Sequence, residues 1–317
     1  MSSIDASRPG EAAPFRRRPR GDFRVKRSRL GERAIEFGLF LAASAAVLIT
    51  LGILWVLVSE SIGFFSHVGL WRFLSESRWS PLFANPHYGI APLLCGTLLS
   101  TLVALAVAGP LGFFSAVYLS EFARPAARET IKPILELLAG VPTVIYGYFA
   151  LLFVTPLLQT FIPGLPGFNI LSAGLVIGIM VVPYIASLSE DAMRAVPESL
   201  RSGSLALGAT RLETAFRVVA PAAVSGIAGA FVLGVSRAVG ETMVVAIAAG
   251  QVPQITLDPR DPAATITAYI AQVALGDLPH GSIGYQSIFA AGLTLLVLTL
   301  AFNLLAFWMN RRFREAY

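Results

Sequence analysis

The chain has 317 residues, of which 55% are hydrophobic and only 14% are charged, and its formal net charge is +5. Soluble domains carry about 25% charged residues, so this composition excludes an ordinary soluble protein and indicates a polytopic membrane protein. The single cysteine, Cys95, excludes an intramolecular disulfide framework. We therefore expect an all-α fold whose helices cross a membrane.

Basic residues gather before the first apolar run, where ten of the 24 Lys and Arg residues lie within residues 1–33. This charged region is too long for a signal peptide, and the apolar run after it has spanning length without a clear cleavage signature. We interpret the tail as a determinant of topology that contacts anionic lipids, and not as an arm that binds nucleic acid.

Six stretches are apolar and long enough to cross a bilayer as helices, which takes roughly 20 residues each. The second contains Gly109-Pro110, which predicts a kink. A run rich in Pro and Gly at 162–169 separates the third from the fourth. The predicted spans are Phe37–Val58, Pro92–Leu119, Leu137–Phe161, Ile170–Ser189, Ala222–Gly250 and Ser287–Met309.

An even number of spans leaves both termini on one side of the membrane, and the basic residues decide which side. They concentrate in the tail, in the loops 121–133 and 191–221 and after the last span. The positive-inside rule therefore places these segments on the cytoplasmic side of a cell membrane (inner or plasma membrane). The predicted organisation is a basic cytoplasmic tail (1–33), a first transmembrane helix (34–59), an extracytoplasmic segment (60–91), a five-helix core (92–310) and a cytoplasmic C-terminus (311–317).

Two charges stand within the fifth predicted span, Arg237 and Glu241. Charges in hydrocarbon cost about 2.5–3.5 kcal/mol each, so they normally face a cavity and serve a pathway or a partner. At a spacing of four residues they share one helix face and neutralise each other. The guanidinium suits an anion, so the pair predicts an anion pathway; the alternative is a permanent ion pair that fixes helix packing. Thr242 either lines the same path or bonds to the backbone carbonyl four residues earlier in its helix.

The loop 191–221 has the pattern of a compact helical elbow. Pro197 suits the first turn of one short helix, Gly208 permits a tight turn, and Thr210 with Glu213 forms a capping box for a second helix.

Two leucines of this elbow, Leu205 and Leu207, are expected to be exposed. Such a surface suits docking into a groove of another protein. The alternative interpretation is an amphipathic loop that lies on the membrane surface, and the residues alone favour neither.

The elbow resembles the EAA loop of ABC importer permeases when it is aligned on Gly208, with Val218-Val219-Ala220-Pro221 as its end and Ser202-Gly203-Ser204 in place of Glu-Ala-Ala. More specific motifs resemble the PstC family of phosphate-importer permeases, and this likeness covers residues 30 to 312. Met243-Val244 departs from the Ala-Pro typical of the sister PstA family. The motifs that carry the PstC likeness are Tyr88–Leu98, Leu119–Glu121, Glu136–Gly147 and Arg237–Met243.

The resemblance implies the fold of a type I ABC importer permease with six transmembrane helices. It implies a heterodimer with a PstA-like permease, two ATP-binding subunits that hold ATP and magnesium, and an extracytoplasmic phosphate-binding protein, with no cofactor on this chain. It places Arg237, Glu241 and Thr242 on the substrate pathway. The ATPase-coupling residues would be Ser202, Leu205, Leu207, Gly208, Ala209, Arg211, Glu213 and Pro221, within the segment 195–213 and its continuation.

Other functions remain as alternatives. One is a permease for another oxyanion, such as sulfate or molybdate, and another is a phosphate-sensing scaffold. An ATPase of the P-loop type is excluded, because Lys26 and Lys132 are the only lysines and neither follows a glycine. No catalytic or metal site is expected either, because three histidines lie in the outer segments without metal-ligand spacing: His67, His87 and His280.

Overall fold

The computed structural model describes residues 29–312 except 82, 84, 277 and 280. Most of the predicted basic tail, the last five residues and His280 therefore lie outside the described residues. The chain divides into two units, residues 1–52 and 53–317, and the boundary falls within the first helix. The first unit contributes the start of that helix, α1 (Arg29–His67), and the second unit contains its end and all later elements.

The described part of the chain is helical, as predicted, with two isolated β-bridges in loops. Three π-helical segments, η1 to η3, interrupt the α-helices. The elements after α1 are α2 (Leu70–Ser75), α3 (Ala91–Val117), η1 (Tyr118–Phe122), α4 (Pro125–Ala139), α5 (Thr143–Phe149), η2 (Ala150–Val154), α6 (Thr155–Phe161), α7 (Ile170–Arg194), α8 (Glu198–Ala206), α9 (Arg211–Thr214), η3 (Ala215–Val219), α10 (Ala220–Ala222), α11 (Val224–Val239), α12 (Met243–Ala248), α13 (Ile266–Ala274) and α14 (Ile283–Arg312).

Five helical stretches among the described residues are long and apolar enough to cross a membrane. A sixth span exists if the two helices Arg211–Ala222 and Val224–Val239 count as one, although they meet at an angle of 74°. The five stretches are Gly31–His67, Ala91–Phe122, Thr143–Phe161, Ile170–Arg194 and Ile283–Trp308.

The prediction of a continuous fifth helix over Ala222–Gly250 is wrong. The backbone leaves the helix at Gly240 and begins a new one at Met243, because the first amides of α12 bond to a side chain instead of continuing the helical ladder. The third span also begins later than predicted, at Thr143, since α4 ends at Ala139 and Pro142 has a non-helical conformation with a ψ of 132°.

The predicted cytoplasmic loop 121–133 is mostly helix, and this corrects the sequence interpretation. Helix α4 begins with Pro125 at its first position, which suits a helix start, and it continues past Pro133. It is strongly amphipathic, and none of its residues is fully buried. Its polar side chains therefore decide how it is attached to the bundle.

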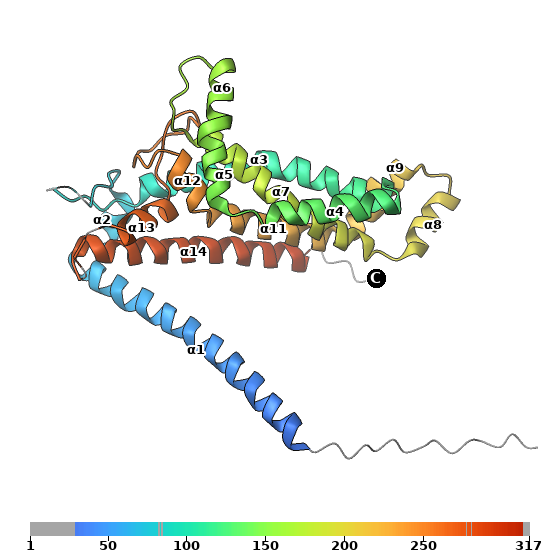
Figure 1. Cartoon of the computed structure of the whole chain (residues 1–317), viewed down its shortest axis with the longest axis horizontal. Helices are drawn as coiled ribbons and strands as arrows, with labels where there is room; N and C mark the ends of the chain where they lie inside the picture. Colours follow the sequence, from blue (N-terminus) through green and yellow to red (C-terminus); the bar gives the residue numbers. More distant parts are fainter. Residues whose placement is uncertain (1–28, 82, 84, 277, 280, 313–317) are drawn as a thin grey trace, which may run out of the picture. The chain divides into compact units, whose positions relative to one another are not determined.

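An aromatic cluster closes one end of the unit. Helix α1 continues to His67, beyond the expected end of the first span, and brings Phe64 against Phe73 of α2 at 5.8 Å between ring centroids. Trp79 is buried and packs edge-on against Tyr269 of α13 at 4.9 Å. Figure 1 shows α2 and α13 at this end, and α8 and α9 at the other.

The centre of the unit is a tight packing of α3, α7 and α11. Ile185 of α7 lies between two glycines, and a Cβ atom at Gly112 or Gly234 would come within 2.8 or 2.9 Å of it. These glycines let α3 and α11 approach α7 closely. The close approach fixes the last turn of α11, which carries Arg237, against α7.

Candidate functional site

The charged pair lies at a break between two helices. Glu241 is buried, and its Oε1 accepts hydrogen bonds from the backbone N–H groups of Met243 at 3.1 Å and Val244 at 3.3 Å. Its backbone carbonyl accepts a bond of 2.6 Å from the hydroxyl of Thr267, which lies in the first turn of α13. The carboxylate of Glu241 therefore caps the N-terminus of α12, a role that shorter side chains usually have.

Arg237 stands in the last turn of α11, and 40% of its side chain is exposed. Its Nη2 lies 3.9 Å from Oε2 of Glu241, so the predicted pairing exists as a long ion pair. The two residues approach each other across the end of a helix, and the expectation that they share one helix face is wrong. The cause is the break at Gly240, which lets Glu241 turn toward α12.

The guanidinium of Arg237 makes no hydrogen bond to the described residues. Its Cζ atom lies 5.9 Å from the ring centroid of Tyr184 on α7, and its Nε is buried with no hydrogen-bond partner among the described residues. A guanidinium offers five N–H donors in a fork that matches carboxylate and phosphate oxygens. The described residues therefore leave hydrogen-bond donors of this guanidinium unpaired.

Thr242 lies inside the break and is partly buried. Its hydroxyl donates to the carbonyl of Gly240 at 3.3 Å, two residues earlier. The alternative bond that the sequence suggested, to a carbonyl four residues earlier in a helix, does not form, since residue 242 is not helical.

Two polar residues near the break were not singled out by the sequence. Tyr184 supplies the aromatic face for Arg237, and Asn303 of α14 accepts a hydrogen bond of 3.3 Å from the hydroxyl of Ser236. Asn303 could have been found, because it is a carboxamide inside an otherwise apolar span. Tyr184 could not, because one tyrosine in a span gives no indication of its neighbour.

The segment 195–214 forms the predicted elbow. Pro197 precedes the first turn of α8, and Gly208 ends the helix with a φ of +87°, a left-handed conformation that glycine adopts without strain. The predicted capping box is confirmed. The Thr210 hydroxyl accepts from the amide of Glu213 at 3.2 Å, and the Glu213 carboxylate accepts from the amide of Thr210 at 2.9 Å.

The residues expected to contact an ATPase lie on the outside of this elbow. Leu207 is 91% exposed and Leu205 is 46% exposed. Ala209 is half-buried. The other members of the set are exposed: Ser202, Gly208, Arg211, Glu213 and Pro221.

Arg201 fastens the elbow to the bundle. Its guanidinium donates to both carboxylate oxygens of Glu121, at 3.3 and 3.2 Å, and Glu121 lies in η1 at the end of α3. The same guanidinium donates to the carbonyls of Val196 at 2.6 Å and Met193 at 2.8 Å. Glu121 was noticed only as part of a motif, and its partner 80 residues away was not predictable from spacing.

A second buried carboxylate, Glu190, holds α4 against α7. It is fully buried, and it accepts hydrogen bonds from Nε of Arg128 at 2.8 Å and Nζ of Lys132 at 2.7 Å. Burial opposes the charged form of Lys132, but hydrogen bonds to Asp191 and Glu190 outweigh it and raise the pKa of its ammonium group. From the sequence, these basic residues were assigned only a role in topology.

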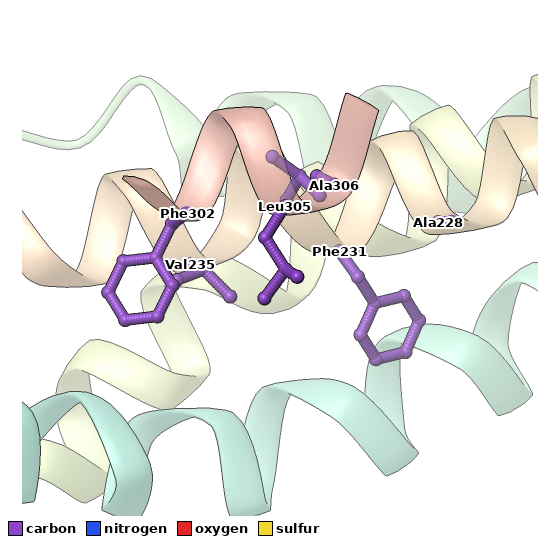
Figure 2. A pocket seen from close by; sticks show the side chains of 7 residues that line it. Ala228, Phe231, Val235, Phe302, Leu305 and Ala306 are labelled. Atoms are coloured by element: carbon purple, nitrogen blue, oxygen red, sulfur yellow. The ribbon is translucent and has the colours of Figure 1, made fainter. Parts of the chain in front are cut away.

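The apolar cavities of the unit are not candidate anion sites. A cavity of about 360 Å³ lies between α11 and α14. Figure 2 shows that the labelled side chains around it consist of carbon alone, including Phe231, Phe302 and Leu305. A site without donors cannot replace the hydration of an anion. Among the described residues there is also no group of three or more potential metal ligands.

Comparison with known proteins decides the family. The profile of the "Binding-protein-dependent transport system inner membrane component" family matches residues 108–315. The chain belongs to this family. It is therefore a multi-pass membrane component of a transport system.

Several relatives can be aligned with most of the chain. YqgH of Bacillus subtilis, described as a probable ABC transporter permease protein, is 35% identical over 86% of this chain and 87% of the relative. A phosphate transport system permease protein PstC from Mesorhizobium japonicum is 33% identical over 95% of this chain and 96% of its own length. The PstC protein of Xylella fastidiosa is 31% identical over 86% of both chains. The resemblance to PstC-type permeases is thus confirmed.

Solved structures support the fold. A chain of a bacterial ABC transporter that imports the polysaccharide alginate is 18% identical, with a TM-score of 0.62 over 90% of this chain and 100% of the other. A chain of the MetNI methionine ABC transporter gives a TM-score of 0.53 at 18% identity, over 72% of this chain and 95% of that one. The predicted type I ABC importer permease fold is confirmed.

Proposed function

We propose that this chain is a permease subunit of an ATP-driven importer of inorganic phosphate, and that the anion passes Arg237. The relatives named as phosphate transport system permeases support this substrate. The observation that carries the proposal is the state of the Arg237 guanidinium, which has an aromatic face and a distant carboxylate as its only recorded partners among the described residues.

This state favours a transport role over a structural ion pair. A buried pair that served packing would be expected to make close, hydrogen-bonded contacts, because its desolvation is repaid only by good geometry. Glu241 instead uses Oε1 for the amides of α12 and keeps Oε2 3.9 Å from Arg237. Phosphate would bring oxygens to the free donors of Arg237, while Glu241 keeps the charge of the empty site balanced. Thr242, at the same break, would line the path.

The transport system to which we assign the chain has further subunits. A PstA-like permease would form the second half of the pathway, two ATPase subunits would bind ATP and magnesium, and an extracytoplasmic phosphate-binding protein would deliver the anion. The elbow would dock on an ATPase through Leu205 and Leu207, whose exposure supports a protein contact. In this arrangement both termini and the elbow lie in the cytoplasm, as the positive-inside rule indicates.

Substrate competition tests the proposed anion. The chain is reconstituted in proteoliposomes with its second permease, its ATPase and its binding protein, and uptake of radiolabelled phosphate is measured with excess sulfate or molybdate. We expect uptake that requires ATP and is not reduced by either competitor. Uptake of sulfate or molybdate instead of phosphate would overturn the substrate and retain the permease. A complete system that moves none of these anions would favour a sensing scaffold.

A further inference from the structure

None of the residues of helix α4 is fully buried, and polar contacts attach its N-terminal half and its C-terminal end to the bundle. Toward its N-terminal end, Arg128 and Lys132 bind the buried carboxylate of Glu190 at 2.8 and 2.7 Å. Glu190 lies in the last turns of α7, one turn before Arg194, where that helix ends. These contacts therefore attach this part of α4 to the C-terminal end of α7.

The other end of α4 is bound by two tyrosines. The last carbonyls of a helix have no partner within the helix and need other donors. The hydroxyl of Tyr146 donates to the carbonyl of Leu138 at 2.8 Å, and the hydroxyl of Tyr184 donates to that of Ala139 at 3.4 Å. The first of these bonds is short, and the second is at the long limit.

Tyr184 also touches the arginine of the candidate pathway. The centre of its ring lies 5.9 Å from Cζ of Arg237, which is within the range of a cation–π contact. The side chain of Arg237 makes no hydrogen bond to the described residues. Its interactions with them are the cation–π contact with this ring and the long ion pair with Glu241. One side chain thus contacts both the end of α4 and the guanidinium.

We propose that Tyr184 is a positioning residue for Arg237: its ring orients the guanidinium toward the anion, and its hydroxyl, together with Tyr146, ties that orientation to the end of α4. The inference rests on the proposed function, because it assigns to Arg237 the anion that crosses the membrane. Tyr184 does not touch the anion in this account and acts through the arginine.

The contacts continue from α4 to the elbow. Arg201 of α8 binds the carbonyls of Met193 and Val196, three and six residues after Glu190. Static contacts therefore connect the elbow to Arg237 through the end of α7, which also carries Tyr184, and through the Glu190 contacts and α4. Such a series of contacts is a physical route for coupling, and only measured coupling between its members establishes it.

The test compares Tyr184→Phe with Tyr184→Leu in the complete reconstituted transporter. Phe keeps the aromatic face, and Leu removes it at similar volume. Tyr148→Leu is the matched control, because Tyr148 is an exposed tyrosine on α5. We expect Tyr184→Leu to raise the KM for phosphate about threefold or more, in line with the loss of a cation–π contact, while Tyr184→Phe and the control keep the KM of the wild type.

The tie to α4 is tested in the same assay by the double variant Tyr146→Phe with Tyr184→Phe. Its KM should be unchanged, and its phosphate uptake per ATP hydrolysed should fall by at least about twofold. Equal KM values for Tyr184→Leu and the wild type would overturn the role of the ring. An unchanged ratio of uptake to ATP hydrolysis would overturn the tie.

A double-mutant cycle keeps the inference separate from the proposed function. Thermal unfolding of the complex in nanodiscs is followed for the wild type, Tyr184→Leu, Arg237→Gln and both together. A smaller loss of stability from Tyr184→Leu when Arg237 is already replaced demonstrates their interaction, whatever the transporter carries. Additive effects would refute it. If Tyr184→Leu does not assemble, Tyr184→Gln takes its place in both measurements.

Discussion

Glu241 has two tasks in the structure, and they can be separated by substitution. Its Oε1 accepts two amide hydrogen bonds at the start of α12, and its charge lies 3.9 Å from Arg237. The first task needs only an acceptor oxygen, whereas the second needs a negative charge. Glutamine supplies the first without the second, and alanine supplies neither.

We therefore expect Glu241→Ala to lower the free energy of unfolding by about 1–2 kcal/mol, the usual loss for a capping side chain, and Glu241→Gln to lower it much less. Thermal unfolding of the assembled complex in detergent measures both. Phosphate uptake should fall in both variants, because both lose the charge. A Gln variant as unstable as the Ala variant would show that the charge, and not the cap, holds the break together.

At the scale of single elements, the turn of the elbow depends on one backbone conformation. Gly208 has a φ of +87°, and nothing lies within 4 Å of the position a Cβ would take. Gly203, in the helix before it, has equally open surroundings and no left-handed conformation. The same substitution at these two sites therefore differs only in backbone strain.

Gly208→Ala should destabilise the elbow by about 1 kcal/mol, while Gly203→Ala should stabilise α8 by about 0.5–1 kcal/mol. In the complete transporter we expect Gly208→Ala to lower phosphate uptake per ATP hydrolysed, with normal insertion in the membrane. Gly203→Ala should transport like the wild type. Equal coupling in the two variants would argue against the elbow as the coupling element.

The attachment of α4 provides a further test at this scale. Removing one partner of a buried charged group costs about 3 kcal/mol, because the remaining charges lose their compensation. Glu190→Gln should therefore lower the unfolding temperature markedly. Glu129→Gln, at an exposed position of α4, should leave the unfolding temperature unchanged. Limited proteolysis within 125–139 should be faster in the first variant only, and equal rates would contradict this role for Glu190.

At the scale of the whole molecule, the apolar stretches of spanning length predicted the helical membrane fold, and the distribution of basic residues predicted the orientation of the chain in the membrane. The elbow was also predictable, because Pro197, Gly208, Thr210 and Glu213 act on their immediate neighbours. The break after Val239 was not, since its cause is a carboxylate that bonds to amides beyond it and a contact with Thr267. Long-range partners depend on tertiary packing, which local patterns do not contain.

The same limit applies to the buried charges. Arg128 and Lys132 belong to a helix that was interpreted as a short basic loop, because its two prolines and its charged residues interrupt the apolar run that indicates a membrane span. Their partner Glu190 lies some 60 residues away at the end of an apolar span. Sequence reasoning assigned Arg128 and Lys132 to a loop and missed that they hold two helices together.

The most direct measurement is phosphate uptake by Arg237→Gln in cells without their own importer, supplied with the partner subunits. Arg217→Gln is the matched control, because Arg217 has the same spacing and the same 3.9 Å distance to its glutamate but is 80% exposed. At equal membrane levels we predict that uptake is lost in Arg237→Gln, by about tenfold or more for a charge-assisted contact, and retained in Arg217→Gln. Wild-type uptake in Arg237→Gln would contradict the central claim that the anion passes this arginine.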